Sequence, residues 1–261
     1  MRNLVIGNTS QLSHYFPKEN FDFISSRNIN YNSLNENYDK VFLCFGESRK
    51  FLEDKNTYDD INFFLTLKII DFFKDRANKV IIYSTCELWN QYSGPVDLKK
   101  EIKFFNTSYL SSKFKITDYI LKNNEIYRNV LIMFPFNFNS IYRNENFLFG
   151  KIFNSIINKQ PTQIGNTYFY RDIIHPKLVV KTSLIAEKHQ LIGSGRMIFV
   201  NDFIKDLYHH FNLRYDNYIT ENFDRFNEYE KNNEYYLKSD KCLFTYKELL
   251  NYTIEDIESK L

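Results

Sequence analysis

The chain has 261 residues, 43% of them hydrophobic, which suffices for one substantial core with a smaller lobe. Its 34 basic residues nearly cancel its 32 acidic ones, so the overall charge gives no reason to expect nucleic acid or an anionic membrane as partner. No apolar run approaches the roughly 20 residues that a membrane-spanning helix needs, and three scattered cysteines without a Cys-x-x-Cys pair indicate a reducing, cytoplasmic setting without disulfides or bound zinc.

The first half of the chain is predicted to alternate short strands with helices. Short apolar runs without polar alternation are typical of strands buried on both faces, and apolar residues at helical spacing mark the segments between them. Strands are expected at 4–6, 21–25, 41–45, 80–83 and 130–134, one brief helix up to about residue 16, and longer helices at 58–74 and 109–121. This alternation predicts an α/β fold with a doubly wound parallel sheet.

Beyond about residue 140 the pattern changes. Helices are predicted at 148–158, 178–188 and 202–211, a polar loop up to 172, a loop at 215–238, and short helices at 245–261. Residues 1–140 are therefore expected to form the core domain, and residues 141–261 mainly a smaller lobe that is interleaved with it.

The first predicted strand leads into Gly7-Asn8-Thr9-Ser10-Gln11-Leu12-Ser13, where a dinucleotide-binding fold has its glycine-rich turn. Glycines there let backbone amides at a helix N-terminus approach a pyrophosphate. Only the first glycine is present, although serine hydroxyls can also bond to phosphate. Gly7, Ser10, Gln11 and Leu12 are candidates to contact a cofactor pyrophosphate, and an ordinary strand-to-helix turn explains the pattern about equally well.

The second predicted strand ends in Ser25-Ser26-Arg27. A site that prefers NAD usually has an acidic residue here for the ribose hydroxyls, whereas a serine and an arginine suit a ribose 2′-phosphate. Ser26 and Arg27 therefore favour NADP(H) over NAD. The alternative is that Arg27 is only a solvated cation in a loop.

Tyr109 and Lys113 form the most informative pattern, because residues four apart share one face of a helix. An ammonium beside a phenol favours the phenolate and lowers its pKa, so the tyrosine can exchange a proton near neutral pH. Ser84 and Thr85 follow a buried strand and offer hydroxyls that can steady a developing alkoxide. The order of these residues along the chain makes a chance match less probable than the Tyr-x-x-x-Lys spacing alone.

In these motifs the chain resembles the extended short-chain dehydrogenase/reductase family, the NAD(P)-dependent nucleotide-sugar epimerases, dehydratases and reductases. The resemblance runs nearly end to end and implies a Rossmann NAD(P)-binding core, with Thr85 as the catalytic hydroxyl. It rests on the segments Gly7 to Ser13, Tyr83-Ser84-Thr85-Cys86-Glu87-Leu88-Trp89, Tyr109 to Lys113, Phe134-Pro135-Phe136-Asn137, Tyr170-Arg171-Asp172-Ile173-Ile174-His175 and Ser239-Asp240-Lys241.

The resemblance also implies partners and further roles. Asn137 and Arg171 match the residues that contact the substrate's diphosphate, and Arg143 or Arg225 are candidates to assist them. A homodimer through the helix of Tyr109 is expected, with Phe114, Ile116 and Ile120 offered for contact. His175 is expected to be a core or interface histidine, because its segment is structural in the family.

The chain departs from the family pattern at several positions. Phe134 stands where an arginine is customary, Lys177 where an aspartate commonly follows, and Cys86 where a dehydratase needs an acid. Glu87 could act as a base, bind a sugar hydroxyl or be structural. The sequence thus predicts an NADP(H)-dependent reductase of a nucleotide-linked keto-deoxy sugar, 4-keto by expectation, in polysaccharide biosynthesis. The alternatives are a 4-epimerase or dehydratase with bound NAD, and a catalytically silent Rossmann scaffold.

Overall fold

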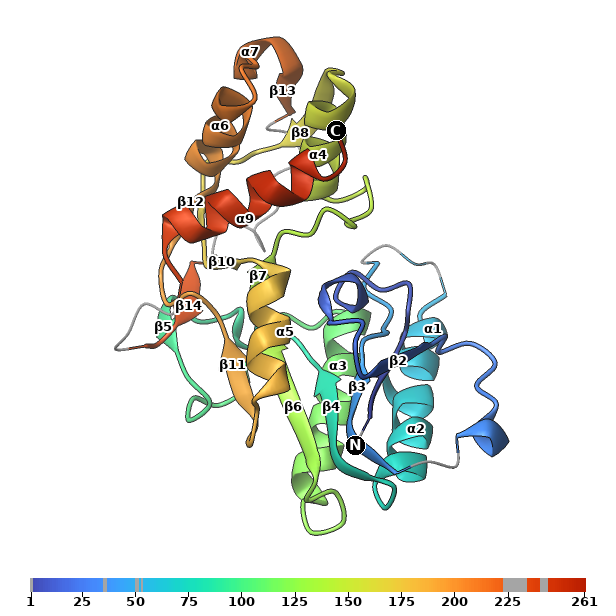
Figure 1. Ribbon diagram of the computed structural model, residues 1–261. Helices are drawn as coiled ribbons and strands as arrows, with labels where there is room; N and C mark the ends of the chain where they lie inside the picture. The colour runs from blue at the N-terminus through green and yellow to red at the C-terminus, as the bar shows by residue number, and fades with distance from the viewer. Residues whose placement is uncertain (1, 35–36, 50–51, 53, 223–233, 240–243) are drawn as a thin grey trace. The chain divides into compact units, whose positions relative to one another are not determined.

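The computed structural model describes residues 2–34, 37–49, 52, 54–222, 234–239 and 244–261 (Figure 1). The chain divides into two compact units, which we call the sheet unit (residues 1–88, 104–135 and 179–191) and the second unit (residues 89–103, 136–178 and 192–261). Each unit is therefore assembled from segments that are far apart in the sequence. Among the described residues, no helix is both long and apolar enough to cross a membrane.

The sheet unit is built on six strands in the order β2-β1-β3-β4-β6-β11. The pairings β1 with β2, β1 with β3, β3 with β4 and β4 with β6 are all parallel. The predicted α/β fold with a doubly wound parallel sheet is confirmed. The strands are β1 (Asn3–Ile6), β2 (Phe21–Ile24), β3 (Tyr38–Leu43), β4 (Ala77–Tyr83), β6 (Val130–Pro135) and β11 (Gln190–Ile192). The strand order reverses between β1 and β3, which is where open parallel sheets bind ligands.

Helices cover both faces of this sheet. Figure 1 shows α3 behind strands β4 and β6 and α5 in front of them. The helical elements are α1 (Asn56–Asp59), the π turn η3 (Asp60–Leu65), α2 (Thr66–Phe73), α3 (Ser108–Lys122) and α5 (Pro176–Leu184). The helix predicted at 58–74 thus contains a π turn, a feature that is frequent at functional sites, and the helix predicted at 178–188 starts earlier and ends at Leu184.

The connection between β1 and β2 contains less helix than the strand-to-strand connections of this kind of fold usually do. It contains only the 3-10 turn η1 (Ser13–Tyr15), after which Phe16 is extended and Pro17 follows. Proline cannot continue a helix from the preceding turn, because it lacks the N–H and clashes with the carbonyl four residues earlier. A second 3-10 turn, η2 (Tyr31–Ser33), lies between β2 and β3.

The second unit combines helices with pairs of short strands. Its elements are β5 (Gly94–Val96), β7 (Asn137–Phe138), α4 (Leu148–Asn158), β8 (Thr162–Gly165), β9 (Tyr170–Arg171), β10 (Ile173–Ile174), β12 (Ile198–Phe199), α6 (Val200–His210), α7 (Tyr215–Tyr218), β13 (Ile219–Asn222), β14 (Tyr235–Leu237) and α9 (Tyr246–Glu258). The 3-10 turn η4 (Cys86–Trp89) leads into it. The strands pair two by two, as β7 with β10, β9 with β12, β8 with β13 and β5 with β14.

Three predictions for the second unit were wrong. The segment up to residue 172, predicted as a polar loop, contains β8 and β9. The segment 215–238, predicted as loop, contains α7, β13 and β14, and both strands pair with partners more than 50 residues away. The segment after residue 245, predicted as several short helices, is the single helix α9. It starts at a capping box in which the Thr245 hydroxyl accepts from the Glu248 N–H and the Glu248 carboxylate accepts from the Thr245 N–H.

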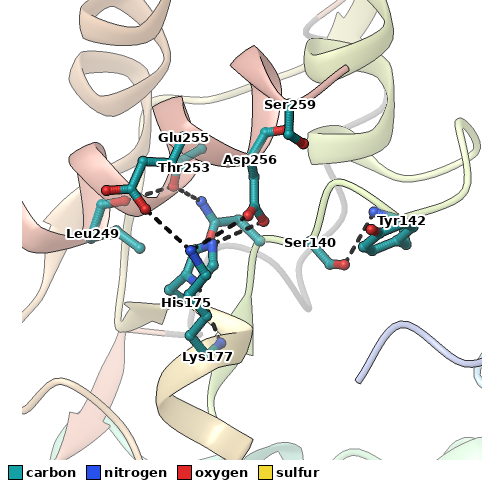
Figure 2. A network of polar contacts seen from close by, with 10 residues as sticks. Ser140, Tyr142, His175, Lys177, Leu249, Thr253, Glu255, Asp256 and Ser259 are labelled. Atoms are coloured by element: carbon teal, nitrogen blue, oxygen red, sulfur yellow. Dashed lines mark hydrogen bonds and ion pairs between the residues drawn. The ribbon is translucent and has the colours of Figure 1, made fainter. Parts of the chain in front are cut away.

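A buried polar network joins α9 to the segments that follow β7 and β10 (Figure 2). The Asn139 side chain donates to the Thr253 hydroxyl at 2.6 Å. His175, wholly buried as predicted for a core histidine, accepts the Lys177 N–H at Nδ1, so its Nε2 carries the proton that reaches Asp256 at 3.1 Å. Burial lowers the pKa of His175, which keeps the ring neutral at pH 7.

Candidate active site

Helix α3 presents Tyr109 and Lys113 one turn apart. The helix starts where the Thr107 side chain accepts the Leu110 N–H. Lys113 is only 8% exposed, and its ammonium donates to the Tyr83 carbonyl, at the end of β4, at 3.0 Å. Burial lowers the pKa of Lys113 to about 8. The Tyr109 ring meets the Tyr58 ring edge to face, with centroids 6.5 Å apart. A titratable amine therefore lies buried on the same helix face as a partly buried phenol.

Ser84 and Thr85 follow β4 directly and are each 7% exposed. The Thr117 hydroxyl donates to the Lys113 carbonyl at 2.8 Å, so the Ser84 hydroxyl, 3.0 Å away, must be the donor to Thr117. The Ser84 side chain thus links the end of β4 to α3 by a hydrogen bond. The Thr85 hydroxyl accepts the Glu87 N–H at 3.2 Å, which leaves its own proton available for an oxygen that binds beside it.

Sequence reasoning missed Asn62, which lies on the π turn η3 and is 1% exposed. Its amide oxygen accepts the Glu47 N–H at 2.9 Å, and its amide nitrogen donates to the Glu47 carbonyl and to the Ser112 hydroxyl, both at 3.0 Å. Ser112 in turn donates to the Tyr109 carbonyl at 2.7 Å. Asn62 therefore joins the loop after β3 to the turn of α3 between Tyr109 and Lys113. The sequence feature that could have pointed to Asn62 is its position as a polar residue on the apolar face of the predicted 58–74 helix.

Gly46 keeps space open beside the lysine. A Cβ at this position would lie 3.1 Å from both the Lys113 ammonium nitrogen and the Asn62 amide oxygen, so a larger residue would press on both groups. Next to it, Glu47 is buried and bonds to the Arg49 guanidinium at 2.9 and 2.6 Å. The bonds to Arg49 lower the pKa of the Glu47 carboxyl.

The turn after β1 is held mainly by hydrogen bonds within the turn and to the end of β2. Gly7 has φ of +100°, and a Cβ there would lie 2.9 Å from the Phe45 nitrogen, so only glycine fits. The Gly7 and Asn8 amides both donate to the Ile24 carbonyl, at 2.9 and 3.1 Å. The Ser13 hydroxyl is buried and bonds to the Asn8 and Ser10 carbonyls, at 3.0 and 2.7 Å. Ser13 therefore stabilises the turn with a hydroxyl that no phosphate can reach.

The other cofactor candidates of the sheet unit lie after β2 or within this turn. The bonds from Gly7 and Asn8 to Ile24 bring the turn next to the end of β2, after which Ser26 is half-buried and Arg27 exposed. Among the described residues, Arg27 forms no ion pair. Leu12 is buried and Gln11 half-buried. A cation is thus available at the end of β2.

The candidate diphosphate residues belong to the second unit. Arg171, on β9, is 8% exposed and holds its guanidinium 4.3 Å from the Phe169 ring. Asn137, on β7, is half-buried and pairs in register with Ile173, two residues beyond Arg171. Arg143 stacks on a neighbouring phenylalanine ring at 4.1 Å. Arg225, Asp240 and Lys241 lie outside the described residues.

Asp172 fixes the backbone next to Arg171. This wholly buried carboxylate accepts the N–H groups of Ser194, Gly195 and Leu237 at 2.8, 3.2 and 3.0 Å, and the Ser194 hydroxyl at 2.7 Å. Burial raises the pKa of the Asp172 carboxyl, while these four hydrogen bonds oppose that effect. Arg171 is thereby presented from a rigid backbone.

One further expectation is corrected. Ile116 and Ile120 are 2% and 1% exposed and belong to the core of the sheet unit, so they cannot make dimer contacts. The apolar side chains that α3 exposes are Tyr119 and Leu121, at 37% and 41%. Trp89 is 1% exposed and donates its indole N–H to the Lys100 carbonyl at 3.0 Å, so it packs in the interior.

No known family profile matches the sequence, and no curated protein matches it. Solved structures do match over the full length. RMD from Pseudomonas aeruginosa, complexed with NADPH, aligns with a TM-score of 0.79 at 16% identity over 99% of this chain and 100% of that one. UDP-glucuronic acid 4-epimerase from Bacillus cereus, in complex with NAD, gives 0.76 at 15% identity over 99% and 97%. The dTDP-glucose 4,6-dehydratase DesIV from Streptomyces venezuelae gives 0.80 at 14% over 99% and 97%. The chain therefore has the fold of the extended short-chain dehydrogenases/reductases that modify nucleotide sugars.

Proposed function

We propose that this chain is an NADP(H)-dependent reductase that acts on the C4 keto group of a deoxy sugar linked to a nucleoside diphosphate. The observation that supports it most is Lys113, a buried amine one helical turn from Tyr109 and at the end of the strand that leads to Thr85. Burying an ammonium costs free energy, and such groups gather at functional sites.

Different residues of the sheet unit can each take one role in the reduction of a carbonyl group. The Lys113 ammonium favours the Tyr109 phenolate, so Tyr109 can release its proton to the carbonyl oxygen near neutral pH. Thr85 donates a hydrogen bond to the same oxygen as negative charge develops on it. Ser84 acts as a positioning residue through Thr117. A reduced nicotinamide, when bound, supplies the hydride.

The residues around Lys113 fit a nicotinamide ribose, because Gly46 leaves room beside the ammonium. Ser26 and Arg27 suit a 2′-phosphate, and Gly7, Ser10, Gln11 and Leu12 form the turn between. Asn137 and Arg171 would bind the diphosphate of the substrate, and the half-buried Glu87 a hydroxyl of its sugar. A buried thiol, Cys86, in place of a carboxylic acid favours reduction over elimination of water.

The test is an assay of NADPH oxidation with a panel of nucleotide-linked 4-keto deoxy sugars. We expect oxidation with at least one of them and loss of about 10²- to 10⁴-fold in Tyr109→Phe, which lacks the proton donor. Tyr119→Phe, on the same helix, should stay within twofold. Interconversion of two nucleotide sugars without added NADPH would indicate an epimerase, and an active Tyr109→Phe would contradict the mechanism.

We also propose that two copies of the chain form a homodimer through α3. The Phe63 and Tyr119 rings of η3 and α3 lie 5.8 Å apart, and beside them Phe64 is 56% and Leu121 41% exposed. Two adjacent helices with exposed apolar side chains form a surface that a second copy can cover. Analytical ultracentrifugation should show a dimer that Leu121→Lys dissociates, whereas a wild-type monomer would contradict it.

A further inference from the structure

The second unit contains a pocket of about 340 Å³, which is within the size range of small-molecule sites, roughly 300–1,000 Å³. Residues of β10, β12, α6 and α9 form its wall, together with the segment that leads into β12. Of the described residues that line it, none was proposed above for catalysis or for binding the cofactor or substrate. The pocket is therefore a separate candidate site.

The pocket carries charges of both signs that are not paired with each other. Arg196 lies just before β12, and Asp202 and Asp206 lie one turn apart on α6. Within the described part of the chain, neither Arg196 nor Asp202 forms an ion pair. Two like charges four residues apart destabilise a helix, and a cation beside both carboxylates would relieve their repulsion. A ligand with one positive and one negative group therefore complements this pocket.

Hydrogen bonds from the interior hold both charged sides in place. The Arg196 N–H donates to the Ser194 hydroxyl at 3.1 Å, and that hydroxyl donates to the buried Asp172 carboxylate at 2.7 Å. On the other side, the Tyr246 hydroxyl donates to the Asp206 carboxylate. Burial raises the pKa of Tyr246, so this donor keeps its proton. The backbone of Arg196 and the carboxylate of Asp206 are thus fixed before a ligand arrives.

The remaining wall is apolar. Ile173, Ile198 and Phe244 are 1%, 8% and 6% exposed where they line the pocket. Phe199 also lines it and is half-buried, and its ring lies 5.0 Å from that of Tyr170, its register partner on β9. An apolar or aromatic side chain of a ligand can therefore be covered by apolar groups while its charged end meets the arginine and the aspartates.

We propose that this pocket binds a free α-amino acid with a large apolar side chain. The guanidinium of Arg196 pairs with the carboxylate of the ligand, a pairing that can be bidentate. The carboxylates of Asp202 and Asp206 pair with its ammonium. A neutral saccharide would leave all three charges without an ionic partner, and a residue inside a peptide chain lacks both charges of the ligand. The inference does not depend on the proposed function.

The experiment titrates the common L-amino acids, one at a time, into the whole protein by calorimetry. We expect L-phenylalanine or L-leucine to bind with a dissociation constant below about 1 mM, which corresponds to a modest affinity. Glycine should bind at least tenfold more weakly, because it has no side chain for the apolar wall. Phenylethylamine lacks the carboxylate and phenylpropionate lacks the ammonium, so each should bind at least tenfold more weakly than L-phenylalanine.

Two variants test the charged groups. Arg196→Ala and Asp202→Asn should each weaken L-phenylalanine at least tenfold, and both replace exposed side chains, so the core is undisturbed. Arg214→Ala and Asp216→Asn are the matched controls, because both residues are exposed in the same unit and do not line the pocket. They should leave the affinity unchanged. Failure of every amino acid to bind would overturn the inference, as would equal affinity for L-phenylalanine and phenylethylamine, or equal affinity in wild type and Arg196→Ala.

Discussion

The corner where β4 meets α3 and the turn after β1 lie in the same unit, and they are built in opposite ways. At the corner, Lys113 and Asn62 are buried and their polar atoms are bonded across three different elements. The turn bonds mostly to itself and to its neighbour β2, and its residues Asn8 and Thr9 are exposed.

The difference shows that two parts of one unit hold their polar groups to different degrees. Bonds between distant elements fix side chains within tenths of an ångström, which proton transfer requires. The corner therefore fixes its polar side chains through contacts between different elements, whereas the turn bonds mainly within itself and to β2, a contrast that mutations can test.

The largest effect on stability is expected from Asn62→Ala. It leaves the Glu47 N–H and carbonyl buried without their partner and frees Ser112, so we expect a loss of about 2–4 kcal/mol in the free energy of unfolding. Asn78→Ala, which removes one exposed side-chain bond to Asp39, should cost no more than about 0.5 kcal/mol. Urea denaturation measures both. If both variants lost the same free energy of unfolding, the bonds at the corner would contribute no more than a bond at the surface.

Lys113→Met should instead stabilise the protein while abolishing reduction. The difference between a pKa of about 8 in the folded chain and 10.5 in the unfolded chain corresponds to about 3 kcal/mol. The lost bond to the Tyr83 carbonyl offsets about 1 kcal/mol of it. We expect a net gain of about 2 kcal/mol at pH 7.

The gain should depend on pH. Below pH 8 the lysine is protonated in both states, so the folded state bears the whole cost of burying the charge. Between pH 8 and 10.5 the unfolded chain binds more protons, so wild-type stability rises with pH. The advantage of Lys113→Met should therefore shrink across that interval in denaturation series at pH 7, 9 and 10.5. A constant advantage would contradict a buried ammonium.

Five of the six strands of the sheet were predictable because each of them is a local signal, whereas β11 was not predicted. A short apolar run such as 80–83 indicates a buried strand whatever its partner is, and alternation with helices then implies parallel order. The short strands β13 and β14 carry no such signal. They form because β13 pairs with β8 and β14 with β5, which lie far away in the sequence. Such pairing outweighs the local conformational preference of the residues.

The candidate site divides in the same manner. Tyr109, Lys113 and Thr85 could be proposed from the sequence because the chemistry predicted for them depends on spacing along one helix and on one strand end. Asn62 acts through contacts with Glu47 and Ser112, 15 and 50 residues away, so no local pattern contains its role. The loss of the helix after Gly7 depended on how the turn satisfies its own backbone, which the sequence letters do not specify.

The smallest effect, and the one that separates the two regions most sharply, is expected from Ser13→Ala. Removing the buried hydroxyl loses its bonds to the Asn8 and Ser10 carbonyls and should cost about 1 kcal/mol of stability. Ser33→Ala, which loses an exposed hydroxyl bond to the Asn30 carbonyl, should cost less than about 0.5 kcal/mol. NADPH affinity should stay within twofold in both, because the hydroxyl faces the turn and not a phosphate. A tenfold loss of affinity in Ser13→Ala alone would mean that the turn itself holds the cofactor, and the contrast between turn and corner would fail.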